Sequence, residues 1–445
     1  MTEVLHPGVI VTCNSSFDIL TGHAVVVEGT YIKEIIPSGR AEAVYAEARH
    51  IYKPDMVMTP GFIQTHIHLC QTLFRGLADD LELLDWLQLR IFPYENAHSA
   101  SSLRASVRLG IDELLRGGTT TLLDMGTLRH TEVIFDELAA SGIRAFAGKC
   151  MIDENDLFPG FKGNTGDELR ESYDLAKAFH NTSGGRVNYG FAPRFVLSCS
   201  DRLLRETAEM VKDIPGALIH THSSENKKEV EEVRKKTGKE NIDYFNSIGM
   251  LEQKTVLAHC IHVHDGEVKT MAEKGTSVAH CPSSNLKLAS GIANIPHLLK
   301  SGVNVSLGAD GAPCNNRLSV FREMNMAALI QKPIHGPTSM NAKEVMKLAT
   351  INGAKALGIE HLTGSIEPGK KADLVLLNLN KNGFAAKDDP ELVCSKIVYS
   401  AGQEDVDTVI ADGRILVEGG VSRVYDAGEV FSHGKRELKA LLGRL

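Results

Sequence analysis

Eight short apolar segments recur between residues 57 and 311, and helix-like stretches lie between them. The segments are VMTPGFIQTHIHL (57–69), TTTLLDMG (119–126), IRAFAGKCM (143–151), VNYGFAP (187–193), ALIHTHSS (217–224), TVLAHC (255–260), TSVAHC (276–281) and NVSLGADG (304–311). Strands that alternate with helices pair in parallel, and eight such units in about 250 residues are the size of a closed barrel. The pattern therefore predicts an α/β protein with a (β/α)8 TIM barrel. Residues 102–118 and 225–238 have the spacing of surface helices.

The two ends of the chain carry a different pattern of short strand candidates. Near the amino terminus a hairpin is expected to turn at Glu28-Gly29. The other end contains three apolar segments of the same kind: 372–379, 396–401 and 407–420, the last with the hairpin dipeptide Asp412-Gly413. We therefore expect a small composite β-sandwich domain from residues 1–57 and 369–445, beside a barrel domain over residues 58–368.

Composition excludes several classes of partner. Lys and Arg number 48 against 56 Asp and Glu, so the net charge is −8, and no basic stripe suits a nucleic acid polymer. No apolar run approaches the length that crosses a membrane, and no basic region with a long apolar stretch opens the chain. The eight cysteines form no CxxC pair, which is typical of reduced thiols. We expect a cytoplasmic protein that binds neither nucleic acid nor membrane.

Polar residues collect at the ends of the predicted strands, where a parallel barrel places its catalytic groups. His66 and His68 are two residues apart and so project to the same side of one strand. With His222 and Asp310 they supply the nitrogen and oxygen ligands of one divalent metal ion, either Zn²⁺ or Fe²⁺. His220 shares a strand face with His222, so a shifted register would exchange these two histidines.

Three further roles follow if the metal activates a water molecule. Glu225, three residues after His222, is a candidate to shuttle protons between the water and the leaving group. Asp310 can take the first proton of the water. His259 ends the next strand and can donate a hydrogen bond or a positive charge to the attacked centre.

Five motifs carry a resemblance to a known family. They are PGFIQTHIH (60–68), HTHSSE (220–225), LAHC (257–260), HCPSSNLKL (280–288) and LGADGAPCNN (307–316). The chain resembles the amidohydrolase superfamily over nearly its whole length, within the branch of cytosine, guanine and adenosine-type deaminases and triazine chlorohydrolases. The resemblance implies the mononuclear metal site described above, because the binuclear members have a lysine on the fourth strand and residues 187–193 contain none.

The residues expected to bind substrate suggest two different classes of substrate. Trp86 and Glu95 match the spacing found in the nucleoside deaminases, where an indole offers a flat apolar surface and a carboxylate accepts ribose hydroxyls. Gln71, Arg194 and Phe195 resemble the guanine deaminases instead, since Gln and Arg are donors suited to ring carbonyls or a ring nitrogen.

The predicted reaction is the hydrolytic deamination of an aminated purine, in which Glu225 also contacts the substrate. Lys149 replaces an arginine that contacts the substrate tail in nucleoside deaminases, which favours smaller 5′ groups. The expected substrates are 5′-deoxyadenosine, 5′-methylthioadenosine or S-adenosylhomocysteine, with an inosine analogue and ammonia as products.

Three alternatives to this reaction stay open. One is a guanine, 8-oxoguanine or pterin deaminase, and another is a triazine hydrolase, although Glu225 favours amine over chloride as the leaving group. The third is a barrel scaffold without catalysis. Relatives commonly pair their subunits, which implies a homodimer or a higher homo-oligomer.

Overall fold

A parallel sheet of nine strands forms the centre of the computed structural model, which describes residues 2–382 and 389–445. The strands follow the sheet order β13-β12-β11-β10-β9-β8-β7-β6-β14. Their bounds are β6 (Phe62–His68), β7 (Thr119–Thr127), β8 (Arg144–Met151), β9 (Val187–Pro193), β10 (Leu218–Ser223), β11 (Thr255–His259), β12 (Ser277–His280), β13 (Asn304–Leu307) and β14 (Asp310–Gly311). Each of the eight predicted segments contains a barrel strand, but residues 57–60 of the first segment belong to a strand of the second sheet.

The sheet closes on itself between its first and last strands. β14 pairs in parallel with β6, and the Thr65 and Ser306 hydroxyls form a hydrogen bond of 2.7 Å from β6 to β13. Every residue of β6, β7 and β8 is buried, because helices cover the outer face while side chains fill the interior. The (β/α)8 fold is confirmed.

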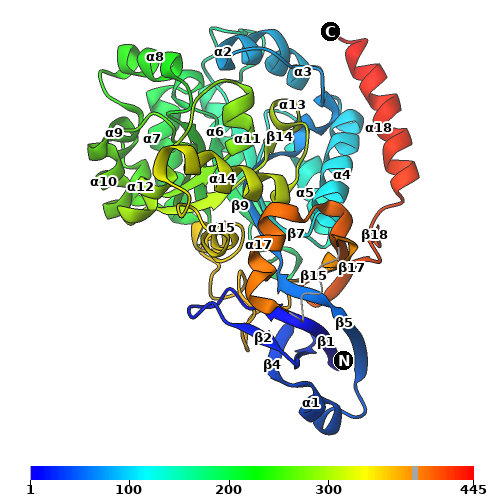
Figure 1. The fold of residues 1–445 in the computed structure, drawn as a ribbon. Helices are drawn as coiled ribbons and strands as arrows, with labels where there is room; N and C mark the ends of the chain where they lie inside the picture. The colour runs from blue at the N-terminus through cyan, green and yellow to red at the C-terminus, as the bar shows by residue number, and fades with distance from the viewer. Residues whose placement is uncertain (1, 383–388) are drawn as a thin grey trace.

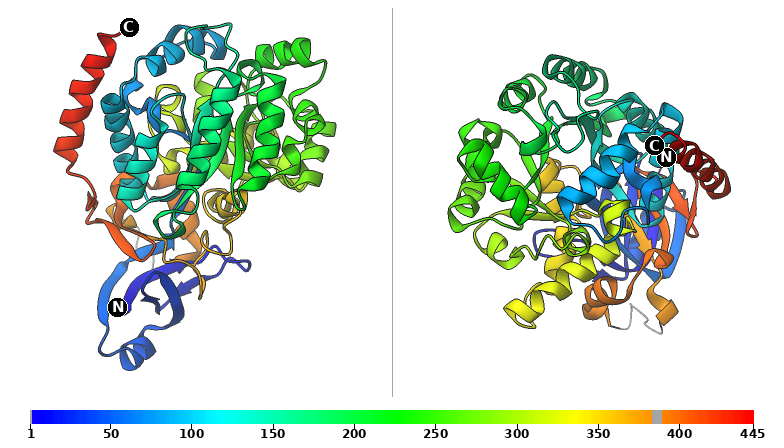
Figure 2. Two further views of the ribbon diagram at one scale, coloured as in Figure 1. Left: turned by 180° about the vertical axis from the view of Figure 1, so that it is seen from behind. Right: turned by 90° about the horizontal axis from the view of Figure 1, so that it is seen from above.

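Helices surround the sheet, as the view down the barrel shows (Figure 2). The predicted helices over 102–118 and 225–238 are confirmed as α4 and α8. The helices between or after the strands are α4 (Ala100–Arg116), α5 (Thr131–Ser141), α6 (Thr165–Phe179), α7 (Asp201–Met210), α8 (Lys227–Thr237), α9 (Asn241–Ser247), α10 (Asp265–Lys274), α11 (Pro282–Lys287), α12 (Ile295–Lys300), α13 (Ala312–Asn315), α14 (Val320–His335), α15 (Ala342–Leu348) and α16 (Ile351–Leu357). In the described residues, no helix combines the length and the apolar character that a membrane crossing requires.

A second sheet joins strands from both ends of the chain. Its strands are β1 (Thr2–Val11), β2 (Ile19–Thr21), β3 (His23–Glu28), β4 (Tyr31–Pro37), β5 (Arg49–Pro60), β15 (Leu374–Leu377), β16 (Val406–Ala411), β17 (Arg414–Glu418) and β18 (Val421–Ser422). β15 pairs with β5, which joins the two termini, and a short helix α1 (Ser38–Val44) follows β4. The composite β-rich domain and both predicted hairpins are confirmed, while its boundaries at 57/58 and 368/369 stay a prediction.

One terminal segment differs from its expected structure. Residues 396–401 were expected to be extended, but most of them belong to helix α17 (Val393–Ser400), which packs against α14 and α15. The reason is periodicity: Val393, Cys394, Ile397 and Val398 are buried and recur at helical spacing. A last helix, α18 (Ala427–Leu442), lies along α4 on the flank of the barrel (Figure 1).

A short helical segment lies over the end of the barrel that faces away from the terminal sheet (Figure 1). It consists of α2 (Leu83–Trp86), one π-helical turn (Leu87–Ile91) and α3 (Phe92–Asn96). Two ion pairs tie its leading end to the barrel, Lys228 to Glu82 and Lys287 to Asp79. This segment therefore covers the ends of the strands that carry the polar residues.

Candidate active site

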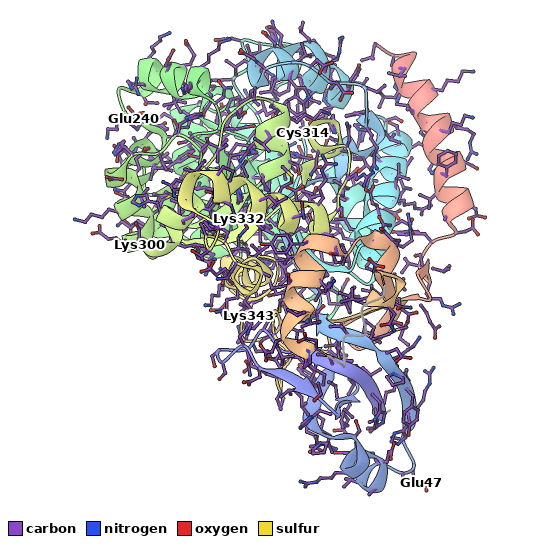
Figure 3. The ribbon with its side chains drawn as sticks, in the orientation of Figure 1. Glu47, Glu240, Lys300, Cys314, Lys332 and Lys343 are labelled. Atoms are coloured by element: carbon purple, nitrogen blue, oxygen red, sulfur yellow. The ribbon has the colours of Figure 1, made fainter. Side chains whose placement is uncertain are left out.

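The predicted ligand residues meet at the carboxyl ends of their strands. His66 and His68 come from β6, His222 from β10, His259 from β11 and Asp310 from β14. The ring centroid of His66 lies 4.9 Å from that of His68, 4.9 Å from that of His222 and 5.4 Å from that of His259. Cys314, labelled in Figure 3, marks the helical turn that directly follows Asp310. Residues up to 244 positions apart in the chain thus share one small volume.

The ring nitrogens of His66 have assignable roles. The Val256 carbonyl can only accept, so Nδ1 of His220 donates to it at 2.9 Å and Nε2 of His220 keeps a lone pair. Nδ1 of His66 therefore donates to that Nε2 at 2.8 Å. Nε2 of His66 is left with a lone pair that faces Oδ1 of Asp310 at 3.3 Å. His220 thus orients His66, and His222 is the histidine that meets the cluster.

The ring nitrogens of His222 can be assigned in the same way. Nδ1 of His222 donates to the Arg194 carbonyl at 2.7 Å, so its Nε2 holds a lone pair. That atom lies 3.2 Å from Nε2 of His68, which is also 3.4 Å from Oδ1 of Asp310. Burial lowers the pKa of both imidazoles well below the usual value and favours the neutral form.

Asp310 is held as an ionised carboxylate. Two hydrogen-bond donors stabilise the ionised form of this buried carboxyl group. The Ser284 hydroxyl donates to Oδ2 at 2.6 Å, and the Gly311 amide donates to Oδ1 at 2.7 Å. The lone pair of His66 faces a carboxylate oxygen, and the lone pair of His222 lies beside His68 in the same cluster. A cation would stabilise this arrangement, so the residues fit a divalent metal ion.

Glu225 and His259 stand beside this cluster. Oε2 of Glu225 lies 3.5 Å from Nε2 of His259, whose Nδ1 donates to the Asn285 side-chain oxygen at 2.8 Å. Burial raises the pKa of Glu225 to about 7. The backbone amide of Glu225 donates to Oε2 of Glu229 at 3.0 Å, so the next turn of helix fixes its position.

Left-handed backbone conformations gather in the same loops. Ser224, His259, Cys260 and Asp310 have φ values of 52°, 73°, 47° and 62°. These conformations are unfavourable for residues other than glycine, and they persist only where the surrounding structure holds them. Their position next to Glu225, His259 and Asp310 marks these loops as the functional end of the barrel.

A pocket opens between the cluster and the helical segment above it. Twelve residues line it: His68, Gln71, Leu83, Trp86, Leu87, Arg194, Phe195, His222, Glu225, Glu229, His259 and Asp310. The apolar part comes from Leu83, Trp86, Leu87 and Phe195, and the polar part includes the predicted catalytic groups. These walls offer an apolar face and reactive groups to a flat heterocycle, and the cavity of about 30 Å³ between them has to widen before a purine enters.

Two of the predicted substrate residues do not line this pocket. Glu95 lies behind it, where its carboxylate pairs with Arg194 and Gln71. Lys149 lies elsewhere, because its ammonium pairs with Oε1 of Glu168 at 3.4 Å and Oε2 of Glu171 at 3.0 Å. The structure does not bring Lys149 to the pocket.

Four supporting roles were not predicted from the sequence. His220 was considered only as an exchange for His222, yet it is the hydrogen-bond partner of His66, and the contacts of Ser284, Asn285 and Glu229 were not expected. Ser284 and Asn285 stand in the HCPSSNLKL motif, so the motif named the segment without revealing its role. Glu229 falls in a charged helix, where spacing alone gave no signal.

The fold and the cluster define a barrel enzyme with a metal-ligand set of residues at the carboxyl ends of its strands. The family model named Amidohydrolase family matches residues 57–416. The chain belongs to the amidohydrolase family, as its motifs indicated.

Individual relatives narrow the comparison. The chain is 40% identical to a 5′-deoxyadenosine deaminase of Methanothermobacter thermautotrophicus over 87% of this chain and 88% of the relative. It is 36% identical to a 5-methylthioadenosine/S-adenosylhomocysteine deaminase of Acetivibrio thermocellus over 97% of this chain and 98% of the relative. A crystal structure of an adenosine deaminase from Xanthomonas campestris with bound zinc superimposes with a TM-score of 0.92, at 28% identity, over 99% of this chain and 98% of that one.

Proposed function

We propose that this protein is a metal-dependent hydrolase that removes the 6-amino group of an adenosine-type nucleoside, giving the inosine analogue and ammonia. The observation that carries the proposal is the lone pair on Nε2 of His66, which faces Oδ1 of Asp310 at 3.3 Å beside a pocket that also holds Glu225. The names of the relatives support the reaction and the class of substrate.

Four side chains would hold the metal: His66, His68, His222 and Asp310. The chemistry that a divalent ion supplies when bound there is Lewis acidity, which lowers the pKa of water. Zinc is our proposed ion, with Fe²⁺ as the alternative, and the zinc in the adenosine deaminase structure supports it. The tautomers fixed by His220 and by the Arg194 carbonyl direct Nε2 of His66 and of His222 toward the shared site.

The surrounding residues would move protons. Water loses two protons as it becomes the ring oxygen substituent, and the departing amine gains one as it leaves as ammonia. With a pKa of about 7, Glu225 is partly protonated near neutral pH, so its carboxyl group can deliver a proton to a ring nitrogen and then take up the second proton of the water. His259, oriented by Asn285, can hydrogen-bond the centre under attack. Asp310 is ionised, so it can accept the first proton of the water and pass it to the departing amine.

A screen of ammonia release tests the proposal. Purified, zinc-loaded protein would be offered 5′-deoxyadenosine, 5′-methylthioadenosine, S-adenosylhomocysteine, adenosine, guanine, 8-oxoguanine and cytosine. We expect the 6-amino nucleosides to release ammonia, with 5′-deoxyadenosine among the best. If only guanine or 8-oxoguanine released ammonia, the proposed substrate would change from a nucleoside to a free base. If no compound released ammonia, the proposed deaminase activity would be refuted.

The remaining expectations concern the setting of the enzyme. A net charge of −8 supports a small-molecule substrate rather than a nucleic acid polymer. The homodimer or higher homo-oligomer and the cytoplasmic location stay predictions.

A further inference from the structure

Asp124 is a fully buried carboxyl group near the carboxyl end of β7. Its Oδ1 accepts the backbone amide of Leu69 at 2.7 Å, and its Oδ2 accepts the backbone amide of Gly126 at 2.9 Å. Leu69 directly follows His68 in the chain. Asp124 therefore binds the backbone next to a proposed metal ligand, although it has no part in the proton transfers proposed above.

Strand β6 needs support at this point because its pairing with β7 is interrupted. Gln64 faces Leu122 and Ile67 faces Asp124, so β6 takes three steps where β7 takes two. The extra residue lies in the stretch that contains His66. An irregularity of this kind turns side chains in a new direction and leaves the local pairing incomplete. Pairing resumes at Ile67, which stands between the two histidines of β6 and opposite Asp124.

Asp124 also supplies a partner where β6 ends. After His68 the chain enters a 3-10 turn (Leu69–Phe74), so the amide of Leu69 needs an acceptor outside the strand ladder. The Asp124 side chain is that acceptor. The other side of the turn is held by α4, where the Ser106 hydroxyl donates to the Leu69 carbonyl at 2.8 Å. The direction in which β6 ends is therefore set by β7 and α4 together.

The second oxygen of Asp124 holds β7 itself. Between Asp124 and Thr127, β7 takes three steps where β8 takes two. Gly126 lies in this irregular stretch with a φ of 78°, and its amide donates back to Asp124. A Cβ at position 126 would lie 1.7 Å from the Gly148 carbonyl oxygen, so the stretch requires glycine. One carboxyl group thus fixes the irregular ends of two neighbouring strands, with one oxygen for each.

We infer that Asp124 is a positioning residue of the proposed metal site, which fixes the end of β6 so that His66 and His68 present nitrogen atoms to one ion. The inference rests on the proposed function, because it requires that these histidines bind a metal. Both oxygens of Asp124 must accept. An asparagine cannot replace them, since its side chain has one accepting oxygen and one donating nitrogen.

Zinc binding to the folded protein tests this role without turnover. Metal-free wild type and Asp124→Asn would each compete for zinc with a coloured chelator, whose absorbance gives the dissociation constant. We expect Asp124→Asn to stay folded by circular dichroism and to bind zinc about 10–100-fold more weakly, because the loss of a residue that orients a ligand has an effect of this size. A purely structural role would lower the thermal midpoint of the metal-free protein and leave the dissociation constant unchanged.

A matched control is another buried aspartate that accepts a backbone amide. Asp405 is 3% exposed, and its Oδ2 accepts the Gly402 amide at 2.9 Å, but it lies just before β16 of the terminal sheet. Asp405→Asn should lower the thermal midpoint and leave the dissociation constant of zinc unchanged. If Asp124→Asn does not fold, Asp124→Ser makes the same comparison, because a hydroxyl can accept one amide without placing a donor against the other.

Three results would overturn the inference: equal zinc binding by wild type and Asp124→Asn, an equal loss of zinc binding in Asp405→Asn, or unfolding of both Asp124 variants with and without zinc. The last result would make Asp124 a requirement of the fold alone. Failure of the proposed function shows separately. A wild type without zinc affinity would refute the metal site on which both rest. A wild type that binds zinc and releases no ammonia in the screen would lose the deaminase activity and keep Asp124 in its role.

Discussion

At the scale of single residues, the site depends on which atom of each side chain is free. His66, His68 and His222 are neutral imidazoles, and hydrogen bonds to His220 and to the Arg194 carbonyl decide which nitrogen of His66 and of His222 faces the cluster. Glu225 differs from Asp310 in its surroundings: burial raises the pKa of Glu225 to about 7, whereas the Ser284 hydroxyl and the Gly311 amide stabilise the Asp310 carboxylate. Two carboxyl groups in one pocket are thereby given different protonation states.

The proton-transfer role of Glu225 can be tested by a conservative substitution. Glu225→Gln keeps the size of the side chain and removes its acid, so turnover should fall by a factor on the order of 10² or more while the metal content stays at the wild-type level. Steady-state kinetics and metal analysis measure the two quantities. Glu231→Gln, on the exposed side of α8, the helix that follows Glu225, serves as the control and should keep full activity. Near-normal turnover of Glu225→Gln would remove Glu225 from the mechanism.

At the scale of elements, short connections after the strands hold the site in place. Glu323 on α14 accepts the Ser283 amide at 3.1 Å and the Asn315 side-chain amide at 2.8 Å. It therefore joins α14 to α11 and to α13, the short helix that follows β14 and its Asp310. Burial raises the pKa of Glu323 to about 7, so this joint is sensitive to pH.

The sign of that sensitivity follows from linkage. The folded-state pKa of Glu323 lies above the unfolded value of 4.5, so its contribution to stability is full below that value and is lost as the pH rises through 7. The loss is on the order of 1–3 kcal/mol. The thermal midpoint of wild type should fall between pH 5 and pH 8 by more than that of Glu323→Gln, whose side chain cannot ionise. Equal pH dependence in the two proteins would contradict the shift.

At the scale of the whole molecule, the sheet built from both ends of the chain contacts one end of the barrel. Arg144 of β8 is buried and pairs with Asp373 just before β15, with Nε 3.1 Å from Oδ2. The terminal sheet thus contacts the barrel at the end away from the pocket. Helix α17 packs against α14 and α15 of the barrel, and α18 packs against α4. The proposed metal site also acts at this scale, because its ligands come from the first, fifth and last strands of the barrel.

Metal removal should therefore lower the stability of the entire barrel. A ligand present at 100 times its dissociation constant adds about 2.7 kcal/mol to folding. We expect chelation to lower the thermal midpoint of wild type by several degrees, measured by scanning calorimetry, with recovery after zinc is added. His68→Ala should unfold at a lower temperature and respond little to the chelator. An unchanged midpoint after verified metal loss would contradict a site shared by these strands.

The sequence by itself determined the eight strands, the composite terminal domain and the candidate ligands, because strand periodicity and strand-end position are local properties of the chain. Tertiary structure decided the rest. The helix over most of 396–401 depended on what its apolar side could pack against, and Lys149 was drawn to Glu168 and Glu171 rather than to the pocket. Most of all, the sequence suggested two different substrates: Glu95 suggested a nucleoside, whereas Gln71 and Arg194 suggested a guanine-type base. These residues became one cluster because their partners are set by chain-distant contacts that no spacing encodes.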